Sequence, residues 1–121
     1  MHHNFRKLKI WQVAMEIVEL TYTTSGKFPR DEMFGLTSQV RRCAVSLPGN
    51  ISEGAGRKST KDFSHFLDMS LSSGNELITE TLVAQKRKYI SGEEAAKLVN
   101  QIEVWQKMTV TFQKRLDNGE L

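Results

Sequence analysis

The feature that most constrains this fold is a stripe of apolar residues that passes through a proline. Its members lie four, three, four and four residues apart, and they are Leu36, Val40, Cys43, Leu47 and Ile51. This spacing places side chains on one face of an α-helix. Pro48 lies inside the stripe, where a proline removes one backbone donor and clashes with the carbonyl four residues earlier. We therefore predict one helix here, kinked at Pro48.

Helical periodicity extends over most of the remaining chain. The predicted helices cover about residues 8–25, 31–53, 60–89 and 92–117. Ser91 and Glu94 have the spacing of a capping box at the start of the last helix, and Gly119 is placed to end it. Because short loops fold each helix back beside the one before it, we predict an all-α, antiparallel, up-down-up-down four-helix bundle, with residues 1–121 as a single domain.

The first predicted helix carries more apolar surface than one bundle core can cover. Besides the stripe that contains Trp11, a second stripe has the same helical spacing and consists of Ile10, Val13, Ile17 and Leu20. A helix that is apolar over most of its circumference is covered by more than one neighbour, and a four-helix bundle has no central helix. We therefore predict that the second stripe is an interface between copies of the chain.

Composition indicates a globular protein of the cytoplasm. Of the 121 residues, 39% are hydrophobic and 26% are charged, and no apolar run approaches the roughly 18 to 20 residues of a membrane span. The first residues lack the pattern of a secretory signal, so we expect a cytoplasmic protein with no membrane partner. Its one cysteine, Cys43, lies on the apolar stripe and is expected to be a buried hydrophobic residue rather than a reactive thiol.

The motifs that would indicate an enzyme are incomplete. The segment GNISEGAGRKST (residues 49–60) approximates a phosphate-binding loop, but Ile51 and Arg57 stand where that pattern requires glycine and lysine. Asp62 and His65 supply one Asp-x-x-His, whereas a two-metal centre in a bundle needs ligands from four helices. No nucleophile can be matched with a base and an orienting group. We therefore predict no catalysis, no metal and no cofactor.

Basic residues are predicted to converge at one end of the bundle. The start of the first helix, the end of the second, the start of the third and the end of the fourth meet there. The basic residues at this end are Arg6, Lys7, Lys9, Arg57, Lys58, Lys61, Lys114 and Arg115. Such a surface can hold phosphates, and it can equally meet an acidic protein partner. The sequence leaves both interpretations open.

Two strings carry a resemblance to a known family. QVRRCAVSLPGNISEGAGRKSTKDFSHFL (residues 39–67) and SSGNEL (residues 72–77) resemble the signature of the four helix bundle protein family, also called the 23S rRNA intervening-sequence or S23 family. The resemblance covers nearly the whole chain. The chain departs from the family pattern at Ser72, where the family usually has glycine, and at Gly74, where it has a larger residue.

The resemblance implies roles for residues of these strings. The residues that match its structural motif are Pro48, Asn50, Glu53, Gly54 and Glu76. We expect Glu53 and Glu76 to make hydrogen bonds that hold the proline hinge against the third helix, with a role in ligand binding or catalysis as the alternative.

The resemblance also implies an assembly and a ligand. The family's bundles assemble as pentamers, so we expect a homopentameric ring. Similar proteins are encoded within rRNA intervening sequences or act as accessory proteins of diversity-generating retroelements. We therefore predict a non-catalytic module that binds structured RNA or another nucleic acid through its basic end. The alternative is an oligomeric protein-interaction scaffold with no nucleic-acid role.

Overall fold

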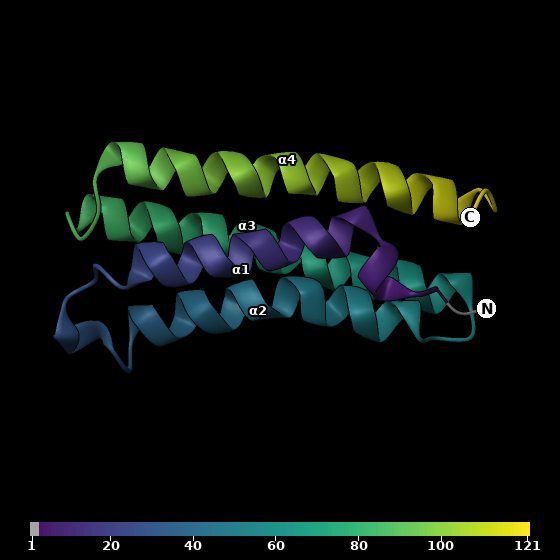
Figure 1. Ribbon diagram of the computed structural model, residues 1–121, viewed down its shortest axis with the longest axis horizontal. Coiled ribbons are helices and arrows are strands. Elements are labelled where there is room, and N and C mark those ends of the chain that lie inside the picture. Colours follow the sequence, from purple (N-terminus) through teal and green to yellow (C-terminus); the bar gives the residue numbers. More distant parts are fainter. Residues whose placement is uncertain (1–2) are drawn as a thin grey trace.

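Four α-helices lie side by side in the computed structural model, which describes residues 3–121 (Figure 1). They are α1 (Lys9–Ser25), α2 (Leu36–Ala55), α3 (Thr60–Lys86) and α4 (Gly92–Asp117). Two short 3-10 helices, η1 (Phe5–Lys7) and η2 (Arg30–Glu32), precede α1 and α2. The described part of the chain contains no β-strand. The predicted all-α bundle of four helices is confirmed.

Contacts between α1 and α4 join residues in opposite order. Near one end, the Trp105 indole Nε1–H donates a hydrogen bond to the Ile10 carbonyl at 3.0 Å. Near the other end, Lys27, two residues after α1, forms an ion pair with Glu94 of α4. Residue numbers therefore rise along α1 as they fall along α4. Figure 1 shows both chain termini at the same end of the bundle.

Helix α2 begins later than its sequence pattern indicates. It begins at Leu36, so the predicted start at residue 31 is wrong. Asp31 and Glu32 belong instead to η2, and the Glu32 carboxylate turns forward to accept a hydrogen bond from the Leu36 amide at 3.0 Å. Glu32 thus caps α2 from outside its first turn.

Helix α3 ends earlier than predicted, at Lys86 rather than at residue 89. Lys88 takes a left-handed conformation with φ of 65°, and the Tyr89 amide donates back to the Ala84 carbonyl at 2.9 Å. This is the hydrogen bond of a Schellman motif, which ends a helix by reversing its backbone.

The two ends of α4 follow the signals in the sequence. Ser91 Oγ accepts a hydrogen bond from the Glu94 amide at 3.0 Å, and Glu94 Oε1 accepts one from the Ser91 amide at 2.9 Å. The predicted capping box is therefore confirmed. Gly119 follows the helix with φ of 76°, the left-handed conformation expected of a terminating glycine.

Pro48 lies inside a continuous α2, and the kink predicted there stays a prediction. Pro48 is buried on the core side of the helix. Side chains bond to backbone carbonyls on either side of it. Ser46 Oγ donates to the Cys43 carbonyl at 2.6 Å, and Asn50 Nδ2 donates to the Ser46 carbonyl at 2.9 Å. Asn50 therefore serves the helix itself and does not reach α3 with this bond.

The second apolar stripe of α1 lies largely within the fold of a single chain. Ile10 and Ile17 are 3% and 0% exposed and belong to the core, so their predicted place in an interface between copies is wrong. Val13 and Leu20 are half-buried and pack against the same core. Helix α1 packs against both α2 and α4, and these two neighbours account for the burial of this stripe. Phe5 of η1 instead packs against Trp11 of the first stripe, with 5.3 Å between ring centres.

Helices α2 and α3 approach closely at Gly54. A Cβ atom on Gly54 would lie 2.8 Å from both Phe63 Cδ1 and Phe66 Cβ, which leaves no room for a side chain. Further along the pair, Ser70 Oγ donates to the Leu47 carbonyl at 2.8 Å in a buried position. Small residues on each helix therefore allow the two backbones to approach each other.

Gly54→Ala should destabilise the protein, because the added methyl group forces the two phenylalanines to move. We expect the free energy of unfolding to fall by about 1–3 kcal/mol in urea denaturation. Gly49→Ala is the matched control, since Gly49 lies in the same helix with nothing within 4 Å of an added Cβ. It should stabilise by ~0.5–1 kcal/mol through helix propensity. Equal effects of both changes would contradict the close approach.

Candidate nucleic-acid interface

The structure places the eight predicted basic residues at one end of the bundle. Arg6 and Lys7 lie in η1, Lys9 begins α1, and the others lie between α2 and α3 or in the first turn of α3 and the last turn of α4. Figure 1 shows these segments at the end that carries both termini. All eight side chains are exposed, so the end presents a positively charged surface.

Neighbouring groups offset part of this charge. Arg57 Nη2 lies 3.0 Å from Glu53 Oε2, and its guanidinium lies 4.7 Å from the centre of the Phe66 ring. Glu53 therefore contacts Arg57, and Arg57 in turn contacts Phe66 of α3. Because the ion pair between Glu53 and Arg57 is exposed, it contributes little to stability. Lys61 lines a groove that it shares with Asp68 and Asp117, whose charges oppose its own. These two cations are poor candidates for binding an anion.

A second groove, between α1 and α4, has a different character. Its volume is about 450 Å³, and it is lined by Lys9, Ile10, Lys107, Met108, Thr111, Phe112 and Arg115. Three of these residues are cationic and none is acidic. Among residues 3–121, the ion pairs join Lys27 to Glu94 and Arg57 to Glu53, so neither involves a cation of this groove. We call this feature the α1–α4 groove.

Buried contacts hold the two walls of the α1–α4 groove together. The Trp105 hydrogen bond to the Ile10 carbonyl ties the first turn of α1 to α4, and the Trp105 side chain is fully buried. On the α4 side, the Phe112 ring packs against Phe63 of α3 at 5.7 Å between ring centres. The cations above this apolar floor therefore project from helices of fixed spacing.

Sequence reasoning found only part of this groove. It found Lys9 and Arg115 because both lie at helix ends, but it missed Lys107, which lies nearly three turns before the end of α4. The signal was present in the sequence, since Lys107, Thr111 and Arg115 are spaced four residues apart and share one face of the helix. A search for basic residues at helix ends alone does not find basic residues that lie along one face of a helix.

A comparison with protein families identifies the chain. The family model described as 23S rRNA-intervening sequence protein matches residues 6–111. The chain belongs to this family. The resemblance in the SLPGNISEG and NEL strings is thereby confirmed. A search of curated protein sequences finds no significant match.

The family glutamate Glu76 belongs to a cluster between α2 and α3. The Cys43 thiol donates to the Ser73 carbonyl at 3.0 Å and lies 3.8 Å from Glu76 Oε2. Burial, with the nearby charges of Glu80 and Glu76, raises the pKa of Cys43 to about 12. Cys43 is therefore a buried, protonated thiol, as its place on the apolar stripe predicts.

Glu80, one turn further along α3, is the most unusual carboxylate of this family member. Its Oε1 atom is buried and has no hydrogen-bond partner within residues 3–121. Burial raises the pKa of Glu80 to about 6, and the charge of Glu76 adds to the effect. Sequence reasoning missed Glu80, although two glutamates four residues apart on one helix already indicate mutual repulsion.

The rest of the described chain offers few sites for other chemistry. Residues 3–121 contain no group of three or more His, Cys, Asp or Glu side chains placed to hold a metal ion. No helix in this range is both long and apolar enough to cross a membrane.

Glu80→Gln should change how stability depends on pH. The pKa of Glu80 is higher in the folded protein than the usual 4.5, so ionisation opposes folding as pH rises through about 6. We expect the variant to match the wild type near pH 4 and to unfold at higher urea concentrations than the wild type at pH 7.5. A difference between the two proteins that stays constant across this range would contradict the assignment.

Proposed function

We propose that this protein is a non-catalytic accessory module that binds structured RNA in the α1–α4 groove. The observation that carries the proposal is the groove's lining, where Lys9, Lys107 and Arg115 flank an apolar floor without any carboxylate. Lysine and arginine bind phosphates and release their counterions, which supplies most of the affinity for nucleic acid. The apolar floor and the half-buried Phe112 offer a surface for an unstacked base or sugar.

The family description supports RNA as the ligand. It refers to intervening sequences of 23S rRNA, and we propose a folded RNA of that kind as the partner. A protein that binds ribosomal RNA would act in the cytoplasm, and we include that location in the proposal. Structured RNA also presents unpaired loops beside paired stems, which suits a groove with cations at its rim and an apolar floor.

Self-association remains a second part of the proposal. Exposed apolar side chains on α3 and α4 support it, and they are Met69, Leu82, Val83, Val104 and Val110. A closed ring would bring several copies of the α1–α4 groove together and strengthen their combined field. The same side chains also favour the alternative function, an oligomeric protein-interaction scaffold that does not bind nucleic acid.

Light scattering behind a sizing column tests the assembly. If the ring has five copies, the mass in solution should be near five times the 13.8 kDa of one chain. A mass of 13.8 kDa at micromolar concentration would contradict self-association. A dimer or hexamer would contradict the pentamer alone. Neither result would affect the RNA proposal, because each groove is built from one chain.

Reversing the groove charges should abolish RNA binding. We expect the triple change Lys9→Glu, Lys107→Glu and Arg115→Glu to remove binding of a labelled RNA hairpin at low salt. If a partial variant such as Lys107→Gln retains binding, it should lower the slope of log affinity against log salt by roughly 0.7 to 0.9, the value for one phosphate contact. Fluorescence anisotropy at several salt concentrations measures both quantities.

The matched control reverses the same number of positive charges at the other end of the bundle. Arg30, Lys86 and Lys97 are exposed and lie on η2, the last turn of α3 and the first turns of α4. Reversing these three changes the net charge by the same amount and should leave most of the affinity in place. Equal losses from both triples would mean that net charge, and not the groove, determines binding. Absence of wild-type binding at low salt would favour the scaffold function.

A further inference from the structure

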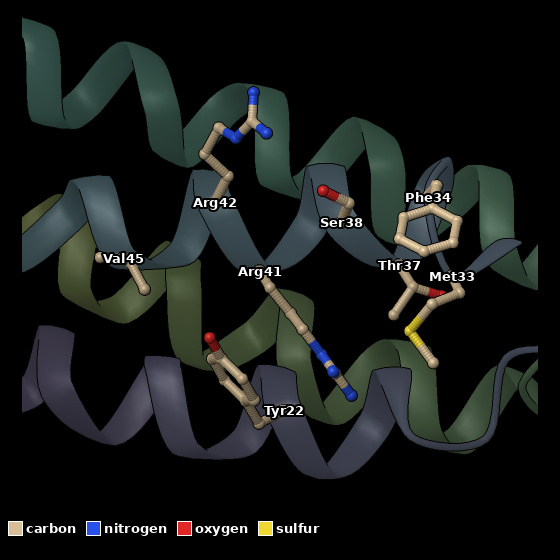
Figure 2. A pocket seen from close by; sticks show the side chains of 8 residues that line it. All are labelled: Tyr22, Met33, Phe34, Thr37, Ser38, Arg41, Arg42 and Val45. Carbon is tan, nitrogen blue, oxygen red and sulfur yellow. The ribbon is translucent and has the colours of Figure 1, made fainter.

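A further groove lies at the end of the bundle opposite the α1–α4 groove, between the last turn of α1 and the first turns of α2 (Figure 2). Its volume is about 450 Å³, and its lining consists of Tyr22, Met33, Phe34, Thr37, Ser38, Arg41, Arg42 and Val45. We call it the Phe34 surface. It shares no residue with the α1–α4 groove, so the proposed RNA site leaves it unexplained.

Phe34 is 97% exposed, the highest value among the large hydrophobic residues of the described chain. Met33, Val45 and Tyr22 around it are 49%, 48% and 44% exposed. Single exposed apolar side chains are common on protein surfaces, but several that line one groove mark an interaction site. The Phe34 surface is therefore an apolar patch that no part of residues 3–121 covers.

The turn that presents Phe34 is held rigidly. Glu32 accepts hydrogen bonds from the Leu36 amide at 3.0 Å and from the Tyr89 hydroxyl at 2.8 Å. These two bonds, the Leu36 bond first, lower the pKa of Glu32. The Gly35 amide also donates to the Glu32 carbonyl at 2.9 Å. A partner that binds Phe34 would therefore meet a preorganised backbone turn, and little conformational entropy of the loop would be lost on binding.

Two arginines give the Phe34 surface its charge. Arg41 Nε donates to Ser25 Oγ at 2.9 Å, and its guanidinium lies 4.7 Å from the centre of the Tyr22 ring. Arg41 is thus fixed, and its terminal nitrogens remain to bind a planar carboxylate. In Figure 2, Arg41 extends toward α1 while Arg42 points to the other side of α2, toward α3. No acidic residue lines the groove, so a binding partner that complements it carries negative charge.

The residue types distinguish a protein partner from a nucleic acid. Tyrosine, phenylalanine, methionine and arginine are enriched in protein–protein interfaces, whereas lysine, aspartate, glutamate, serine and alanine are depleted. Five of the eight lining residues are of the enriched types, and one, Ser38, is of a depleted type. The α1–α4 groove, in contrast, contains two lysines among its seven. We propose that the Phe34 surface binds a segment of another protein that carries carboxylates beside an apolar anchor.

Peptide selection tests this proposal even though the partner is unidentified. A displayed library of random 12-residue peptides is selected against the whole protein, and the enriched peptides are synthesised with a fluorescent label. We expect them to be rich in Asp and Glu and to contain an aromatic or aliphatic residue. Replacing their acids with Asn and Gln should weaken binding by at least about tenfold, because the arginines lose their partners.

Variants of the protein locate the binding site. Phe34→Ser and Arg42→Gln change exposed side chains, so both should fold normally, and each should weaken binding of the selected peptides by at least about tenfold. Met15→Ser is the matched control, because Met15 is exposed on α1 and does not line the groove. It should leave the affinity unchanged. Circular dichroism should show that all three variants remain helical.

Three results would overturn the proposal. The first is a selection that returns no binding peptide, or only peptides without an excess of acids. The second is binding of the selected peptides to Phe34→Ser as tightly as to the wild type. The third is a lower mass of Phe34→Ser in light scattering, which would show that a second copy of the chain covers this surface. None of these results bears on RNA binding at the other end.

Discussion

The buried indole of Trp105 joins three of the four helices. Its Nε1–H bonds to the Ile10 carbonyl of α1 at 3.0 Å, and its ring fills the space beside Gly74 of α3, where an added Cβ would lie 2.9 Å from Cζ3. A buried donor without a partner costs about 1–3 kcal/mol, so this bond favours one placement of α1 along α4. The placement of Lys9 opposite Lys107 follows from it. The α1–α4 groove is thus a consequence of core packing.

The bundle presents two surfaces of different chemistry at its two ends. The α1–α4 groove combines lysines with an apolar floor, which suits phosphates beside an exposed base. The Phe34 surface combines fixed arginine with aromatic and methionine side chains, which suits a protein segment. Because the two surfaces share no residue, both partners could bind one chain together. In the proposed accessory role, the bundle would bind an RNA and a protein at the same time and hold them near each other.

Local patterns in the sequence were enough to predict the helices, because periodicity and capping depend on residues within a few positions. Long-range contacts account for what was missed. The second α1 stripe lies in the core because α1 packs against both α2 and α4, and the periodicity of one helix does not show how many neighbours it has. The turn that presents Phe34 is tied to the rest of the bundle by a bond between Glu32 and Tyr89, which lie 57 positions apart. Of the site, helix-end reasoning predicted Lys9 and Arg115 but could not show that Arg57 is paired with a carboxylate.

Cross-linking of bound RNA, mapped by mass spectrometry, tests the central claim most directly. A hairpin that carries 4-thiouridine in its loop is bound at low salt and irradiated, and the cross-linked peptides are identified. The account predicts cross-links in the last turns of α4, between Lys107 and Arg115, and near Lys9 at the start of α1. Cross-links confined to the segment from Met33 to Val45 would contradict it, because RNA would then occupy the surface assigned to a protein partner.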